Sequence, residues 1–171
     1  MNQYPSYIVI CPMQEVVEMA VHQDELDQRM CRFETICRAN GLKVTHQRTE
    51  IFAELAGTNA HPDAETIYCR VHERMPAVSK DTVYRTLALL EEKGLTSKVE
   101  ISGPSRYDAN TDQHHHFVCV RCGLIKDFTS EAMDGLSPPA RVKRWGVVNS
   151  IRVQVCGTCR SCMTQRKRQH K

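Results

Sequence analysis

Two Cys-x-x-Cys pairs constrain the fold of this chain more than any other feature of its sequence. Cys119 and Cys122 form the first pair, and Cys159 and Cys162 form the second. A tight turn in each pair brings two thiolates to one point, so the pairs supply the four tetrahedral ligands that structural zinc prefers. One zinc ion would then close the intervening segment into a small domain. Cys156 precedes Cys159 at the same spacing, so the second pair of ligands is either 156 with 159 or 159 with 162.

The nine cysteines of this 171-residue chain admit two other uses, as disulfides or as the redox dithiol of a thiol-disulfide oxidoreductase. Disulfides are typical of exported proteins, but an odd count leaves one thiol unpaired. The apolar residues 7–13 are too few to span a membrane, and no basic segment precedes them as in a secretory signal. No thioredoxin-like context surrounds either pair. We therefore expect a cytoplasmic protein without a membrane anchor, whose cysteines hold zinc.

The charge of the chain does not by itself indicate a partner. Its composition, with 41% hydrophobic and 25% charged residues, is that of a globular protein of one or two small domains. The net charge is only +3, and residues 31–104 carry ten basic and ten acidic side chains. The last twelve residues are basic, and we expect them to stay solvated. Any binding to nucleic acid therefore has to rest on a local patch.

Helical periodicity and capping residues predict four helices in the first half of the chain. One follows Asp24, Thr45 caps the second, residues 61–63 open the third with Pro62 in its first turn, and Ser79 caps the fourth. Residues 95–101 and 106–108 then form a strand, a turn and a strand. This order is typical of a winged helix-turn-helix unit, in which the fourth helix enters the major groove of DNA.

The second half reads as a small α/β domain. Strands are predicted over residues 117–120, 124–128 and 147–155, and Pro138 and Pro139 interrupt any helix between the last two. The predicted fold class is thus α+β, a winged helix-turn-helix domain followed by a small α/β domain with a four-cysteine zinc site. The expected organisation is an irregular extension (1–23), the winged-helix domain (24–104), a hinge (105–111), the C-terminal domain (112–163) and a basic tail (164–171).

Three consecutive histidines precede the first cysteine pair. On a strand, His114 and His116 would share one face and His115 the other. Two imidazoles with the carboxylates of Asp108 and Asp127 nearby form a mixed nitrogen and oxygen site, which suits iron, manganese or zinc rather than calcium. The alternative is a solvated histidine tract.

Polar side chains on two of the predicted helices are candidates for contacts with DNA. They are Lys80, Thr82, Tyr84 and Arg85 on the fourth helix, and Lys43, His46, Gln47 and Arg48 at the start of the second. Arginine and lysine at these positions could contact base edges or phosphates. An ordinary solvated helix face would carry the same residue types, so the predicted hairpin is what favours DNA binding.

Together these features resemble the Fur family of metal-responsive bacterial transcription regulators. The resemblance covers residues 30–162 and runs through GLKVTHQR (41–48), HPDAETIY (61–68), SKDTVYR (79–85), LEEKGL (90–95), RYD (106–108), HHH (114–116) and CVRCGLIKDF (119–128). It implies a homodimer, joined through the C-terminal domains, that binds a palindromic operator in double-stranded DNA. Aligning Gly157 with the family glycine makes Cys119, Cys122, Cys159 and Cys162 the structural zinc ligands and leaves Cys156 free.

The resemblance also implies a regulatory metal, Fe²⁺ or Mn²⁺, between the two domains. Its ligands would be His61, Asp108, His114, His116 and Asp127. Aspartate at 108 and 127, where iron-uptake regulators more often carry glutamate, is similar to the peroxide-sensing branch. In that branch ferrous iron reacts with peroxide and a ligand histidine is oxidised, and His61 and His114 match the oxidised positions. The chain departs from the family at Ile151, where many relatives carry a histidine of a second metal site.

The sequence therefore predicts a metal-dependent, peroxide-sensing repressor and not an enzyme. An iron- or zinc-uptake regulator of the same family is the alternative. A zinc-dependent hydrolase or deaminase is a more distant one, because it needs a general base beside the metal. The chain contains neither a His-x-Glu nor a His-Glu-x-x-His pattern.

Overall fold

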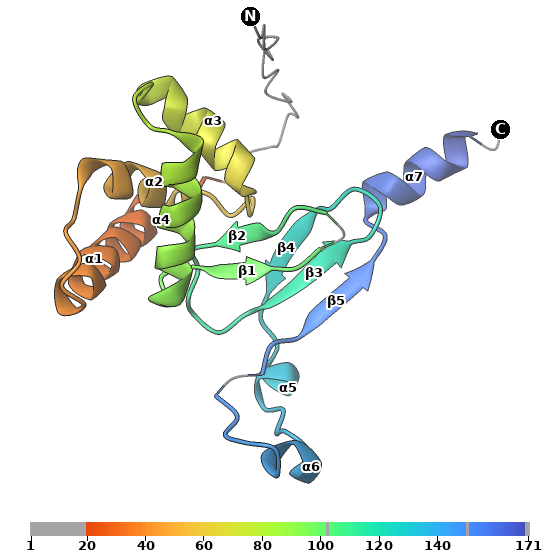
Figure 1. The fold of residues 1–171 in the computed structure, drawn as a ribbon. Helices are drawn as coiled ribbons and strands as arrows, with labels where there is room; N and C mark the ends of the chain where they lie inside the picture. The colour runs from red at the N-terminus through yellow and green to blue at the C-terminus, as the bar shows by residue number, and fades with distance from the viewer. Residues whose placement is uncertain (1–19, 102, 150, 170–171) are drawn as a thin grey trace, which may run out of the picture.

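The structure, a computed structural model, describes residues 20–101, 103–149 and 151–169. Most of the predicted extension over residues 1–23 thus lies outside the described residues. Four helices gather at one end of the molecule, a two-stranded hairpin leads away from them, and a three-stranded sheet follows (Figure 1). The helices are α1 (Gln23–Ala39), α2 (His46–Ala56), α3 (Ala64–Arg74) and α4 (Lys80–Glu92). The α+β fold class predicted from the sequence is confirmed.

Helices α2, α3 and α4 begin at side chains that cap them. Thr45, Asp63 and Ser79 each accept a hydrogen bond from the backbone N–H three residues later. Residues 61–63 lead into α3, and Asp63 caps it, but the first-turn position predicted for Pro62 is wrong, because α3 begins at Ala64 and Pro62 lies before its cap. The Pro62 carbonyl instead accepts a hydrogen bond from the Tyr107 N–H at 2.9 Å. This contact with the hairpin keeps the residue out of the helix.

The four helices bury one apolar core. Phe33 of α1 stacks on Phe52 of α2 with ring centroids 4.8 Å apart. Val83, Leu87 and Leu90 form the buried stripe of α4, as the periodicity predicts. Because this stripe faces the core, the opposite side of α4 is left to polar side chains in solvent.

The hairpin consists of β1 (Ser97–Val99) and β2 (Arg106–Asp108), which pair antiparallel. The predicted strand, turn and strand are therefore confirmed, but the first strand is shorter than the predicted residues 95–101. The structure places residues 106–108 of the expected hinge inside this hairpin. The larger sheet has the order β4-β3-β5, with β3 (His115–Cys119) antiparallel to β4 (Ile125–Phe128) and parallel to β5 (Gln154–Gly157).

A small apolar cluster joins the hairpin to the larger sheet. Val99 and Ile101 pack against Val118 and Ile125. Beside this cluster, Gln154 donates a side-chain hydrogen bond to the Glu100 carbonyl at 3.2 Å. The hairpin thereby links the helical end of the molecule to the sheet (Figure 1).

Between β4 and β5 the chain leaves the sheet and forms two short helices, α5 (Glu131–Asp134) and α6 (Ala140–Lys143) (Figure 1). Pro138 and Pro139 separate them, as predicted. The strand predicted over residues 147–155 is wrong for most of its length, because β5 begins only at Gln154. Val147 is 90% exposed, and an apolar run with no neighbouring strand cannot form a ladder of hydrogen bonds.

The chain continues into α7 (Arg160–Gln169), which includes most of the predicted basic tail. Figure 1 shows this helix projecting from the end of β5. Among the residues that the structure describes, no helix is long and apolar enough to cross a membrane.

Candidate metal centres

Four cysteines meet at the end of β3. The sulfur atoms of Cys119, Cys122, Cys159 and Cys162 all lie within 4.8 Å of one another. Cys119 ends β3, and Cys122 follows in a turn closed by Gly123, whose φ of +70° favours glycine. Cys159 and Cys162 enter from the start of α7. The two Cys-x-x-Cys pairs are thus brought to one point, as the sequence predicts.

Cys156 does not belong to this group. Across the parallel pair of strands it lies opposite Val118, whereas Gly157 lies opposite Cys119. Neighbouring residues on a strand point to opposite faces, so the Cys156 side chain lies on the other face of the sheet from Cys119. Of the two cysteine pairs that the spacing leaves open, the structure brings Cys159 and Cys162 together with Cys119 and Cys122.

The electrostatics of the cysteine cluster fit a divalent cation. A hydrogen bond from the Cys159 N–H, at 3.3 Å, lowers the pKa of the Cys119 thiol to about 6. Hydrogen bonds of the Cys162 thiol with the side chains of Cys122 and Cys159 raise its pKa to about 12. Four sulfur atoms this close can all ionise only if a cation compensates them. The tetrahedral sulfur set is the one that structural zinc takes.

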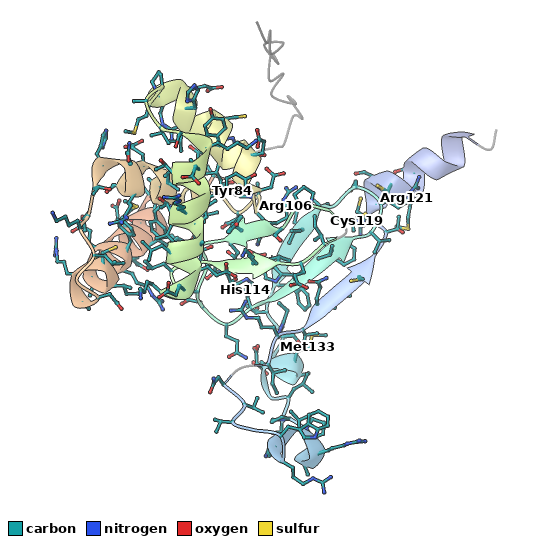
Figure 2. All side chains as sticks on the ribbon, in the orientation of Figure 1. Tyr84, Arg106, His114, Cys119, Arg121 and Met133 are labelled. Carbon is teal, nitrogen blue, oxygen red and sulfur yellow. The ribbon has the colours of Figure 1, made fainter. Side chains whose placement is uncertain are left out.

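A second cluster lies at the other end of β3, where the helical end and the sheet meet. The ligand atoms of His61, Asp108, His114 and His116 all lie within 4.8 Å of one another. His61 comes from the loop before α3, Asp108 ends β2, and the other two histidines stand at the start of β3. Figure 2 shows His114 and Cys119 at opposite ends of this strand.

Asp127 of β4 stands at the edge of the second cluster. Its Oδ1 lies 3.0 Å from His61 Nε2 and 3.5 Å from His116 Nε2. His115 points to the other face of the strand, where its Nε2 lies 3.1 Å from an Asp134 carboxylate oxygen. The alternation predicted for the histidine tract is therefore present.

The ring nitrogens of the second cluster are oriented for a cation. His61 Nδ1 lies 3.0 Å from the Asn59 carbonyl and His114 Nδ1 lies 2.8 Å from the Asp112 carbonyl, so both Nδ1 atoms act as donors. The Nε2 atoms are therefore the ones left to bind a metal, and those of His114 and His116 lie 3.0 Å apart. These two backbone carbonyls are functional partners for which the sequence offers no signal.

Several polar atoms of the second cluster are buried without a hydrogen-bond partner among the described residues. They are His61 Nε2, Asp108 Oδ2 and Asp127 Oδ1. Leaving such atoms unpaired costs about 1–3 kcal/mol each, whereas a bound cation would satisfy all three. The cluster of imidazoles and carboxylates therefore fits a first-row divalent metal.

The charges of the cluster reinforce one another. Burial raises the pKa of Asp108, but the nearby imidazoles of His114, His116 and His61 outweigh it and hold this pKa well below its usual range. The carboxylate of Asp108 in turn raises the pKa of His114 to about 8. Asp108 is thus a permanent anion at the centre of the site.

A polar cleft of about 920 Å³ reaches this cluster from solvent. His114 and His116 line it together with Arg32, Gln113 and Arg152. Ile151 also lines it. Small solutes can therefore reach the two imidazoles without opening the fold.

Most of the predicted DNA-contacting side chains lie on the surface. Lys80, Tyr84 and Arg85 are exposed on the outer side of α4, where Lys80 pairs with Glu65 and Arg85 pairs with Asp81 at 3.0 Å. Figure 2 shows Tyr84 on this helix. Thr82 is half-buried, and its hydroxyl lies 2.9 Å from the Ser79 hydroxyl at the cap.

The residues predicted on the second helix lie at its start. Lys43, His46 and Gln47 are exposed. Arg48 is half-buried and donates a hydrogen bond to the Lys43 carbonyl at 2.7 Å. Three of these four side chains are thus available to a partner, while Arg48 braces the loop before α2.

Comparisons with known proteins identify the family of this chain. The model of the ferric uptake regulator family matches residues 39–155. The peroxide operon regulator of Bacillus subtilis is 32% identical over 126 residues, which are 73% of this chain and 87% of that protein.

Two solved structures extend the similarity to the fold. The ferric uptake regulator of Helicobacter pylori, described as having three functional metal binding sites, has a TM-score of 0.66 and 26% identity, covering 81% of this chain and 93% of that one. A zinc uptake regulator in complex with zinc and DNA has a TM-score of 0.62 and 25% identity, covering 83% and 97%. The four-cysteine cluster is a zinc-like site and the histidine and aspartate cluster a candidate regulatory metal site. Members of the matched family are transcription regulators and not enzymes. This chain belongs to the ferric uptake regulator family of metal-dependent transcription regulators.

Proposed function

We propose that this protein is a repressor that binds a palindromic operator in double-stranded DNA as a homodimer, with Fe²⁺ or Mn²⁺ as its regulatory metal. The observation that carries the proposal is the origin of the second cluster. His61 and Asp108 come from the helical end and the hairpin, whereas His114, His116 and Asp127 come from the larger sheet. A metal bound by both parts fixes the angle between them.

That angle controls DNA binding if the larger sheet forms the dimer. The two copies of α4 then have to match the spacing of two half-sites, and a fixed angle favours that arrangement. A zinc ion held by Cys119, Cys122, Cys159 and Cys162 would keep the sheet folded throughout. The similar fold of a zinc uptake regulator that binds DNA supports this function.

Arg85 offers the most direct test of the DNA-binding face. We expect Arg85→Ala to weaken operator binding by about 1–3 kcal/mol, the usual cost of losing one base contact. Fluorescence anisotropy in the presence of Mn²⁺ measures this on an operator selected from randomised duplex DNA. Arg38→Ala is the matched control, because Arg38 is also exposed on a helix and paired with an acid four residues away.

Two outcomes contradict the DNA-binding proposal. One is a selection that yields no inverted repeat when Mn²⁺ is present. The other is an Arg85→Ala variant that binds the selected operator as tightly as the Arg38→Ala control does.

We further propose that the regulatory site senses peroxide when it holds iron. The cleft beside His114 and His116 supports this, because hydrogen peroxide is small and polar enough to enter it. The similarity to a peroxide operon regulator supports it as well. Iron would supply the redox chemistry, and His61 and His114 are the side chains held against it. An iron- or zinc-uptake regulator of the same family is the alternative.

Mass analysis of peptides separates these two functions. After peroxide treatment of the iron-loaded protein, we expect one added oxygen atom on the peptides that contain His61 or His114, together with loss of operator binding. The manganese-loaded protein is the control and should stay unmodified. If the iron-loaded protein keeps both histidines intact and still binds DNA, the chain is an uptake regulator and the peroxide proposal fails.

A further inference from the structure

Arg106 makes a contact that the hairpin itself does not require. Its Nε donates a hydrogen bond to the backbone carbonyl of His61 at 2.5 Å. The same strand holds the next two residues of that loop, because the Tyr107 N–H donates to the Pro62 carbonyl at 2.9 Å and Arg106 pairs with Asp63 in an isolated bridge. The loop that carries His61 is thus tied to β2 at three successive residues.

The backbone of His61 depends on such ties. Its φ of +50° lies in the left-handed region, which residues other than glycine adopt infrequently. Conformations of this kind persist where the surrounding structure imposes them. The carbonyl that Arg106 holds belongs to the His61–Pro62 peptide, whose orientation would change if the backbone relaxed. The imidazole, which is 2% exposed, would then turn away from the carboxylates of Asp108 and Asp127.

We infer that Arg106 is a positioning residue for the regulatory metal. It holds His61 in the left-handed conformation, so that Nε2 faces the cluster. Because β2 also ends in Asp108, one strand supplies a ligand and orients a second one. The inference rests on the metal site of the proposed function but not on DNA binding.

Cobalt binding tests this role without DNA. Co²⁺ is titrated into the full chain with zinc in the cysteine site, and its visible absorption reports the number and type of ligands. Arg106→Met should weaken Co²⁺ binding 10–100-fold, the usual loss when an outer-shell partner is removed. Its spectrum should shift toward that of His61→Ala. Arg106→Lys keeps the charge and a donor, so it should recover part of the affinity and the wild-type spectrum.

A double-variant cycle separates positioning from general stability. If Arg106 acts through His61, adding Arg106→Met to His61→Ala should not weaken Co²⁺ binding further. Arg48→Met is the matched control in this assay without DNA, because Arg48 makes the same type of contact, at 2.7 Å, with the Lys43 carbonyl, away from both clusters. It should leave the cobalt spectrum of the second cluster unchanged.

Three results would overturn the inference. In the first, Arg106→Met binds Co²⁺ with the wild-type affinity and spectrum. In the second, the loss of Co²⁺ affinity caused by Arg106→Met adds in full to the loss caused by His61→Ala. If Arg106→Met does not fold, the same cycle is run with Arg106→Ala, which also removes the donor, and a wild-type affinity and spectrum there is the third. A wild-type chain that binds no cobalt outside the cysteine site would instead refute the proposed function, and this role with it.

Discussion

Replacing Cys119 by serine is expected to abolish zinc binding and to unfold the three-stranded sheet. Cys119 is buried at the end of β3, and its sulfur atom meets the other three at one point. The apolar cluster that this sheet shares with the hairpin consists of only four side chains. In small domains of this kind, zinc binding contributes about 10–16 kcal/mol that is also folding free energy. Losing one ligand therefore removes the main stabilising interaction of the sheet.

Zinc content by mass spectrometry of the native protein and thermal unfolding by circular dichroism measure this effect. Cys156→Ser is the matched control, since Cys156 is also a β-strand cysteine but lies on the other face of the sheet. It should keep one zinc ion per chain and the wild-type melting temperature. A Cys119→Ser protein that retains zinc and the sheet would refute the structural role of the cluster.

Replacing His61 by alanine is expected to abolish the response of DNA binding to metal while preserving zinc. The imidazole is a direct ligand in the proposed site, so its loss should exceed the 10–100-fold effect of removing an outer-shell partner. The helical core does not depend on the ring, which faces the second cluster. Histidine and alanine both carry the Cβ that disfavours a left-handed backbone, so this backbone conformation should cost the variant about as much as the wild type.

Titration of operator binding with Mn²⁺ measures the response, and zinc content shows whether the fold is intact. His72→Ala is the control, because His72 lies in the neighbouring helix α3 and contacts the Val78 carbonyl instead of the cluster. It should retain the full response. If His61→Ala still binds its operator at wild-type Mn²⁺ concentrations, His61 is not a ligand of the regulatory metal.

Local signals in the sequence predict the helices well and the strands less well. Thr45 and Ser79 cap helices where expected, because a cap is a contact between residues three apart. The strand expected over residues 147–155 was misplaced because its apolar residues have no strand beside them. Whether an apolar run becomes a strand depends on a partner elsewhere in the chain, and β5 finds that partner only from Gln154 onward.

The two metal centres also differ in how well local signals in the sequence predict them. The cysteine cluster follows from the Cys-x-x-Cys spacing, which brings each pair together through a local turn. His61 has no such signal, since it meets His116 only after the chain has folded, and its place in the site was suggested by resemblance alone. The contact between Arg106 and the His61 carbonyl was missed entirely, because a backbone acceptor has no residue type to detect.

The parallel pairing of β3 with β5 also sets an order of events during protein synthesis. The helices share their core with Leu95, Tyr107 and Ala109, so this unit can fold once residues 23–109 have left the ribosome. The sheet has to wait for residues 154–162, which bring both its third strand and its second cysteine pair. A nascent chain thus presents α4, the helix proposed to read DNA, before it has the complete sheet that carries part of the proposed sensor. Translation that stops in this interval would release a helical unit whose α4 no metal controls.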